Sequence, residues 1–183
     1  YLDSAATSLQ KSPAVARAAA HAIRAMASPG RGGHAPAMLA ADTAFRCREE
    51  LSGLFHAPAP ENVVFTMNAT HGLCIAIHSL IRPGDRVVIS GWEHNAVTRA
   101  LGLYGAVIDV AESPLFDRSA ALTAFREKLP GAKCAVCTHV SNVFGFILPI
   151  EDIADACAQQ GMPLIVDASQ SAGVLDIDAR RLG

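Results

Sequence analysis

Four short apolar runs in this sequence are each followed directly by side chains that can bind or catalyse. Hydroxyl, amide, imidazole and carboxyl groups come after these runs, in the segments Asn68–His71, Glu93–Asn95, His139–Asn142 and Asp167–Gln170. If the runs are parallel strands, their carboxyl ends meet at one edge of a sheet, which is where such folds bind ligands. The sequence therefore predicts one polar site at that edge.

These groups together suit an aromatic, cationic and phosphorylated ligand. A helix start with free N–H groups attracts a phosphate, and the Thr70 hydroxyl adds a donor. His94 is flat enough to stack on a ring, and Asp167 can keep a pyridine nitrogen protonated. Amides and hydroxyls can bind a ring oxygen. Pyridoxal 5′-phosphate combines these features, so we expect it as the cofactor.

Each of these residues also has a purely structural interpretation. The segment Asn68–Thr70 can cap a helix, because Asn and Thr are favoured at that position. His94 can be a solvated residue at a helix start, Asn142 can cap a loop, and Asp167 can be a capping aspartate.

The elements that position these residues alternate between helix and strand. Helical spacing or composition predicts helices over 12–27, 36–56, 70–81, 93–103, 120–129 and 150–160, and apolar runs predict strands over 62–66, 86–90, 106–110, 133–138 and 163–166. The strands show almost no polar alternation, which is typical of a mostly parallel sheet that is buried on both faces. We expect an α/β fold, with residues 1–35 as an arm of helix and loop and residues 36–183 as an incomplete large domain.

Composition excludes several classes of protein. With 15 basic and 17 acidic residues among 183, the chain has a net charge of -2 and no basic run, which argues against a nucleic-acid partner. It has no apolar stretch of 18 residues, so we expect no membrane span. Its first ten residues do not resemble a signal peptide, and the odd number of five cysteines suits a reducing cytoplasm. Since it starts at Tyr1 and ends without a closing element, we expect a fragment of a longer protein.

The motifs of this sequence resemble those of the class V aminotransferase family, specifically the cysteine desulfurases of the NifS and SufS type. Six segments carry the resemblance in order along the chain: YLDSAATS, SPGRGGH, FTMNATHG, WEHNAV, THVSNVFG and VDASQSAG. Ser4 and His71 depart from the residues usual in the family, which are Asn and Glu. The resemblance implies a three-layer α/β/α sandwich, the large domain of the aspartate aminotransferase fold (fold type I), here truncated.

The resemblance also implies a role for individual residues. Thr70 contacts the cofactor phosphate together with the backbone of Ala69 and His71, and His94 stacks on the pyridine ring. Asp167 pairs with the ring nitrogen. Further residues complete the expected site: Gln170 at the ring oxygen, Asn142 near the substrate, and Arg31 and His34 on a loop that approaches the active site of the same or of a partner subunit.

The implied reaction takes sulfur from L-cysteine and leaves L-alanine and an enzyme persulfide, for use in iron–sulfur cluster assembly. The implied parent is a homodimer that passes sulfur to an acceptor protein. Its Schiff-base lysine, persulfide cysteine and carboxylate-binding arginine belong beyond Gly183, and none of Lys11, Lys128 and Lys133 is well placed to substitute. We therefore expect this chain alone to be inactive.

Other interpretations stay open. The parent can be another class V enzyme, such as a selenocysteine lyase, a cysteine-sulfoxide lyase or an aminotransferase, or the chain can be a noncatalytic dimer scaffold or binding module. Cys134 and Cys137 form a CxxC motif, but residues three apart on a strand point to opposite faces, which favours structural thiols. His71, His94 and His139 all follow apolar runs, yet we expect no metal site there.

Overall fold

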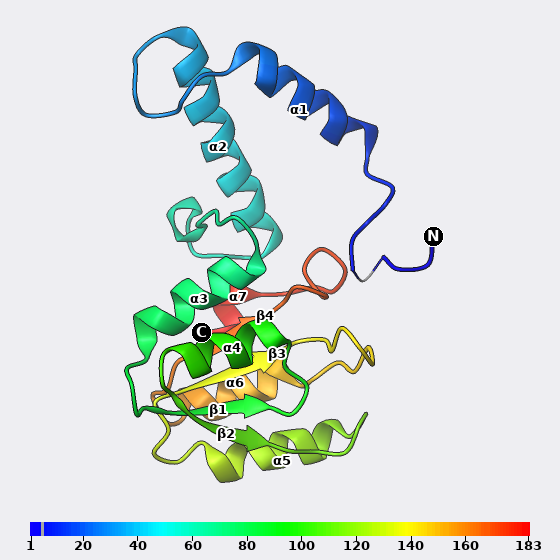
Figure 1. Cartoon of the computed structure of the whole chain (residues 1–183), viewed down its shortest axis with the longest axis vertical. Coiled ribbons are helices and arrows are strands. Elements are labelled where there is room, and N and C mark those ends of the chain that lie inside the picture. Colours follow the sequence, from blue (N-terminus) through cyan, green and yellow to red (C-terminus); the bar gives the residue numbers. More distant parts are fainter. Residues whose placement is uncertain (5) are drawn as a thin grey trace. The chain divides into compact units, whose positions relative to one another are not determined.

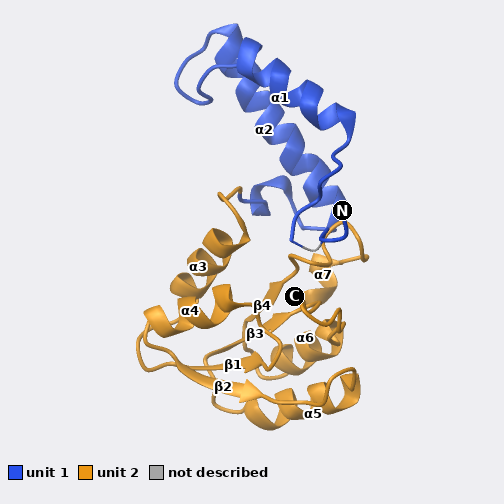
Figure 2. Cartoon of the chain, turned by 45° about the vertical axis from the view of Figure 1, so that its right-hand side comes forward, with its two compact units in different colours: residues 1–64 blue, residues 65–183 orange. Residues whose placement is uncertain are grey.

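The computed structural model describes residues 1–4 and 6–183. The chain divides into two compact units, residues 1–64 and residues 65–183, which Figure 2 draws in different colours. The boundary predicted from the sequence lies at 35/36 instead, and that division stays a prediction.

The unit of residues 1–64 contains two helices and a short 3-10 turn, which are α1 (Pro13–Ala25), α2 (Ala35–Leu54) and η1 (Pro60–Asn62). The Ser12 side chain caps α1 by accepting a hydrogen bond from the N–H of Ala14 at 3.3 Å. Among the described residues of this unit, only Ala37 and Ser52 are buried. Because burial of apolar surface is the main driving force of folding, this unit has little core of its own.

The unit of residues 65–183 alternates helices and strands: α3 (Ala69–Leu80), β1 (Arg86–Ser90), α4 (Asn95–Leu103), β2 (Val107–Ala111), α5 (Arg118–Lys128), β3 (Cys134–Thr138), α6 (Ile150–Ala158), β4 (Leu164–Asp167) and α7 (Ala179–Leu182). The four strands form one parallel sheet in the order β2-β1-β3-β4 (Figure 1). The predicted parallel sheet is confirmed, and the carboxyl ends of all four strands lie at the same edge.

Apolar side chains project from both faces of this sheet. Val87 and Ile89 of β1 pack in a cluster with α3 and α4, whereas Val88 packs in a second cluster with α5 and α6. A strand alternates its side chains between two faces, so the all-apolar sequence of β1 requires helices on both. The predicted three-layer α/β/α arrangement is confirmed.

The two cysteines of the CxxC motif follow the same alternation. Cys134 belongs to the cluster under α3 and α4, and Cys137 to the cluster under α5 and α6. The prediction that they point to opposite faces is confirmed. Burial raises the pKa of Cys134 and of Cys157 to about 11, and it also raises the pKa of Cys137. These thiols stay protonated at neutral pH, as structural core residues do.

The predicted strand over residues 62–66 is wrong. The structure ends the turn η1 at Asn62, and residues 63–66 have no regular secondary structure. Val64 and Phe65 are exposed to solvent at 72% and 47%. An apolar run becomes a strand only when a neighbour completes its backbone hydrogen bonds, and no strand of the described sheet pairs with this segment.

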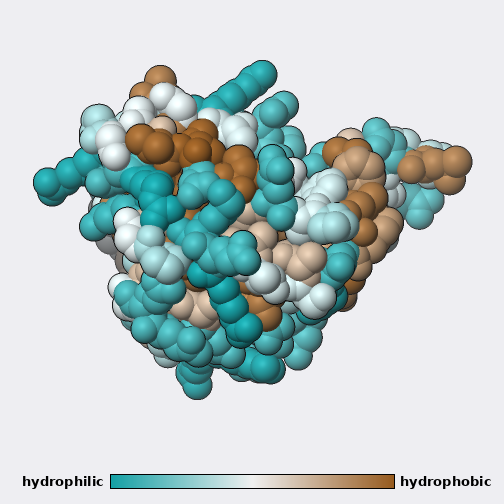
Figure 3. All heavy atoms as spheres, turned by 90° about the horizontal axis from the view of Figure 1, so that it is seen from below, coloured by the Kyte–Doolittle hydropathy of each residue, from teal (hydrophilic) through white to brown (hydrophobic). Residues whose placement is uncertain are grey.

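The surface of the molecule is mixed in character. Figure 3 shows mostly hydrophilic side chains on the face seen from below, with apolar groups gathered in patches among them. Within the part of the chain that the structure describes, no helix is both long and apolar enough to cross a bilayer.

Candidate functional site

The first turn of α3 presents two of the predicted phosphate ligands to solvent. Asn68 precedes the helix, and its side-chain oxygen accepts a hydrogen bond from the N–H of His71 at 2.9 Å. Capping by Asn68 is thus confirmed, while Ala69 and Thr70 lie exposed in the first turn. The backbone donor of His71 is already used by the cap, so the Ala69 N–H and the Thr70 hydroxyl are the better donors for an anion.

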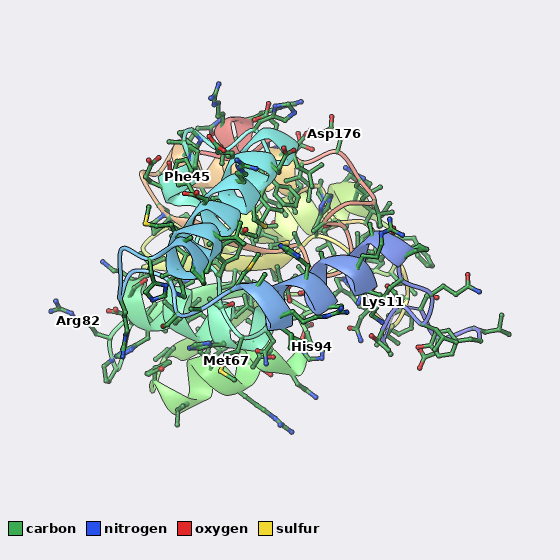
Figure 4. All side chains as sticks on the ribbon, turned by 90° about the horizontal axis from the view of Figure 1, so that it is seen from above. Lys11, Phe45, Met67, Arg82, His94 and Asp176 are labelled. Carbon is green, nitrogen blue, oxygen red and sulfur yellow. The ribbon has the colours of Figure 1, made fainter. Side chains whose placement is uncertain are left out.

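His94 stands immediately before α4, where Figure 4 labels it. Its Nδ1 atom accepts a hydrogen bond from the N–H of Ala96 at 3.1 Å, so the structural interpretation as a residue at a helix start is also confirmed. The ring as a whole is exposed. The cap fixes the orientation of the imidazole and leaves its face available for a planar group.

Asp167 ends β4 and is only 7% exposed. Its Oδ1 atom accepts hydrogen bonds from the N–H of Ser169 at 3.0 Å and from the Ser169 hydroxyl at 2.5 Å. Thr138 of β3 is the register partner of Asp167. The N–H of the next residue, His139, donates a hydrogen bond to the carbonyl oxygen of Asp167 at 2.9 Å. The carboxyl group is therefore held firmly at the carboxyl edge of the sheet.

Two cavities border the first turn of α3 and bring the predicted residues together in pairs. One, of about 350 Å³, lies between α3 and β4 and is lined by both Ala69 and Asp167. The other, of about 220 Å³, lies between α3 and α4 and is lined by both Thr70 and His94. The turn thus offers donors for an anion between a buried carboxyl group and an exposed imidazole.

The other predicted residues are not joined to these cavities. Asn142 and Gln170 lie in the loops after β3 and β4, at the correct edge of the sheet, but they are not among the described residues that line either cavity. Arg31 and His34 belong to the unit of residues 1–64 and are exposed there. Their predicted roles stay predictions.

His139 lines neither of the two cavities beside α3. It is 7% exposed and lines a separate cavity of about 170 Å³ with Arg118 and Glu151. Burial lowers the pKa of His139, and the nearby charge of Arg118 lowers it further. Among the described residues, no group of three or more His, Cys, Asp or Glu side chains is arranged to hold a metal ion.

The structure adds two residues to which the sequence analysis gives no role. Arg99 lines the same cavity as Thr70 and His94 and brings a cation to the side of α3 where an anion is expected. Glu93 lies between β1 and β3 and accepts hydrogen bonds from Ser90 and Thr138. The sequence feature that could have indicated a role for Glu93 is its position after a buried strand and next to His94.

A larger hollow, of about 1090 Å³, lies at the opposite edge of the sheet. Its lining includes Arg82, Asp85 and Lys133, near the amino ends of the strands, together with the stacked rings of His78 and Tyr104. Ligands of parallel sheets bind beyond the carboxyl ends of the strands, so size alone does not make this hollow the site. Lys133 is accordingly placed away from the two cavities beside α3.

Comparison with known proteins gives consistent matches along the chain. A family model described as aminotransferase class-V matches residues 1–183. A probable cysteine desulfurase of Halalkalibacterium halodurans is 32% identical over 195 residues, and one of Pyrococcus abyssi is 27% identical over 192 residues. Both alignments cover 100% of this chain and 47% of the relative. The chain therefore spans about half the length of these curated relatives.

Solved structures give the same result. The apo structure of a cysteine desulfurase from Thermococcus onnurineus NA1 superposes with a TM-score of 0.86 at 26% identity, covering 100% of this chain and 47% of that one. A structure described as SspA in complex with cysteine also gives a TM-score of 0.86, at 25% identity, and 54% of that chain is covered.

Proposed function

The chain belongs to the aminotransferase class-V family, and we propose that its 183 residues form the cofactor-binding half of a pyridoxal-phosphate-dependent cysteine desulfurase. The match over the whole chain and the relatives named as cysteine desulfurases support this proposal. So does the sheet, because its carboxyl edge carries the residues that such a cofactor needs. The resemblance inferred from the sequence motifs is confirmed at the level of the family.

The observation that carries the proposal is the pair of cavities beside the first turn of α3. Asp167, which lines one cavity, would accept a hydrogen bond from a protonated ring nitrogen, and the hydroxyl of Thr70, which lines the other, would donate one to a phosphate. His94 covers a ring face, with its imidazole oriented by the cap on α4. When bound, pyridoxal phosphate supplies an electron sink for reactions at the α-carbon of an amino acid. The donor set of this edge fits that group.

Two of the three lysines of this chain lie away from such a site, which supports the proposal that the chain is inactive alone. Lys128 pairs with Asp109 at 2.5 Å, and Lys133 lines the hollow at the opposite edge of the sheet. Lys11 belongs to the unit of residues 1–64. We propose that the lysine of the reaction follows residue 183 in a longer protein, together with the cysteine that carries sulfur.

The proposal extends to substrate and partners. Relatives named as desulfurases support L-cysteine as the substrate, and a homodimer and a sulfur-acceptor protein complete the proposed system for iron–sulfur cluster assembly. Cys134, Cys137 and Cys157 are buried as free thiols, which supports a reducing location such as the cytoplasm.

The first experiment tests whether the chain has a cofactor site without its own lysine. Pyridoxine 5′-phosphate has no aldehyde and cannot react with surface amines, so its binding to the chain reports the site alone. We expect saturable binding of pyridoxine 5′-phosphate. When pyridoxal phosphate is used instead, we expect no borohydride-reducible adduct at a unique lysine. Absence of binding, or one stoichiometric lysine adduct, would contradict the proposal.

Two substitutions at His94 separate its cap from its ring. His94→Asn keeps a side chain favoured at a helix start but removes the imidazole, whereas His94→Ala removes both. If the ring stacks on the ligand, both variants bind pyridoxine phosphate about tenfold more weakly. Unchanged affinity in His94→Asn would leave the residue as a cap only.

A further inference from the structure

Glu93 places a carboxyl group between the ends of two strands. Its Oε1 atom accepts a hydrogen bond from the Ser90 hydroxyl at 2.5 Å and another from the backbone N–H of Thr138 at 2.7 Å. Ser90 is the last residue of β1 and Thr138 the last of β3. The other oxygen, Oε2, is buried and has no hydrogen-bond partner among the described residues.

The bond to Thr138 continues the sheet where its own ladder stops. The register of β1 and β3 ends at Ile89 and Val136, because the chain turns away after Ser90. Thr138 is 4% exposed, so its N–H would lie buried without an acceptor. A buried donor left without a partner costs about 1–3 kcal/mol. Glu93 supplies the acceptor that the end of β1 no longer provides.

Residues on both sides of this bond belong to the candidate site. Glu93 is followed directly by His94, which begins α4. On the other side, Thr138 is in register with Asp167, and the next residue donates a hydrogen bond to the Asp167 carbonyl oxygen. A rigid link between Glu93 and Thr138 therefore fixes the separation of the imidazole and the carboxyl group.

We propose that Glu93 is a positioning residue of the cofactor site, which ties the end of β1 to the end of β3 and so holds His94 and Asp167 at a fixed separation. The link itself rests on the described contacts, and its role in binding rests on the proposed function. The described contacts through which Glu93 acts are those with Ser90 and Thr138.

The surroundings of Glu93 give this link a dependence on pH. Burial raises the pKa of Glu93 to about 7, hydrogen bonds from Ser90 and Thr138 oppose the shift, and the charge of Asp167 adds to it. Among the described residues, the Cys137 thiol also interacts with Glu93, whose charge raises the pKa of the thiol. Near neutral pH the group therefore exchanges its proton, which distinguishes it from an ordinary surface glutamate.

The experiment compares Glu93→Gln and Glu93→Ala in the full chain, with exposed Glu112→Gln as the matched control. Without ligand, infrared spectra should show a protonated carboxyl band that titrates near pH 7 in the wild type and in Glu112→Gln. Both Glu93 variants should lack it. Amide hydrogen exchange at Thr138 should rise at least tenfold in Glu93→Ala and much less in Glu93→Gln, which keeps an acceptor.

Binding of pyridoxine 5′-phosphate then tests the positioning role. Glu93→Ala should bind at least about tenfold more weakly, and Glu93→Gln should recover most of the loss. If Glu93→Ala exchanges faster at Thr138 but binds as tightly as the wild type, the positioning role is overturned while the cofactor site stands. If amide hydrogen exchange at Thr138 is unchanged, the link itself is wrong.

Failure of the wild type to bind pyridoxine phosphate contradicts the proposed function and with it the role of Glu93 in binding. The exchange experiment then still decides whether the link between Glu93 and Thr138 exists. Should Glu93→Ala not fold, the infrared band and the affinity of Glu93→Gln still decide. If Glu93→Gln binds pyridoxine phosphate much more weakly than the wild type, although its amide keeps an acceptor, the proposal is overturned.

Discussion

Two carboxyl groups of the same sheet are held in opposite ways. Asp109 in β2 accepts hydrogen bonds from Arg86 at 2.9 Å and Lys128 at 2.5 Å, and the bond from Lys128 is the main reason that its pKa is lowered. Glu93, at the carboxyl edge, accepts hydrogen bonds from the neutral donors Ser90 and Thr138, and burial raises its pKa to about 7. Asp109 is ionised and paired with two cations, whereas Glu93 is desolvated and its described hydrogen bonds come from neutral groups.

The difference shows which part of the sheet is arranged for stability and which is not. Ion pairs at a half-exposed position cost little desolvation and fasten β1, β2 and the end of α5 together. A buried carboxyl group without a cation is unfavourable for folding when it ionises. Strongly shifted groups of this kind gather at functional sites, because binding requires charges where folding alone would not place them.

The largest effect should come from removing the ionisable group at position 93. The folded pKa of Glu93 lies above its ordinary value of 4.5, so the folded state holds the proton more tightly than the unfolded state, and stability is lost as pH rises from about 4.5 to 7. A shift of this size corresponds to ~3 kcal/mol. Glu93→Gln lacks this loss, so its free energy of unfolding relative to the wild type should increase by that amount between pH 4 and pH 8.

Urea denaturation at several pH values measures this difference, with Glu112→Gln as the control that should follow the wild type. A constant difference between Glu93→Gln and the wild type across this range would show that Glu93 ionises normally. The contrast with Asp109 would then disappear.

Arg86→Ala should give the next largest effect. The Arg86 guanidinium donates to the carbonyl oxygens of Lys128 and Pro130 as well as to Asp109, so it fastens the end of α5 to the start of β1. Loss of these charged hydrogen bonds should reduce the free energy of unfolding by about 2 kcal/mol at pH 7. Exposed Arg126→Ala is the matched control.

Arg86→Ala also tests the separation of the two regions. Pyridoxine phosphate affinity should stay within about twofold of the wild type, because Arg86 acts at the amino end of β1. A loss of affinity as large as that of Glu93→Ala would mean that the two ends of the sheet are coupled.

The sequence predicted which polar residues follow the strands better than it predicted the contacts that support them. Strand 86–90 and the polar residues after it follow from local pattern, because an apolar run and its neighbours in the chain are enough to recognise them. The bond between Glu93 and Thr138 joins residues 45 positions apart, and no local pattern contains it. The strand predicted over residues 62–66 is wrong for the same reason, because its composition suits a strand but no strand of the described sheet pairs with it.

Asp167→Asn should weaken ligand binding without much loss of stability. The amide keeps an oxygen for the hydrogen bonds from Ser169, but it carries no charge to hold a protonated ring nitrogen. We expect affinity for pyridoxine phosphate to fall about tenfold, which is ~1.4 kcal/mol. Calorimetric titration measures the loss, with exposed Asp155→Asn as the control. Equal affinity in the two variants would remove Asp167 from the ligand site and leave the carboxyl edge without its cation acceptor.

The smallest effect should come from Asp109→Asn, and its pH dependence should be the reverse of that at Glu93. The folded pKa of Asp109 lies below its ordinary value of 3.8, so its contribution to stability is present above that pH and is lost as the pH falls further. Because Asp109 is partly exposed, the variant should lose only about 0.5–1 kcal/mol at pH 7. The difference from the wild type should shrink in acid and in high salt, which screens half-exposed pairs. If the difference instead grew in acid, Asp109 would be titrating like Glu93, and the two ends of the sheet would not differ in the way that their contacts indicate.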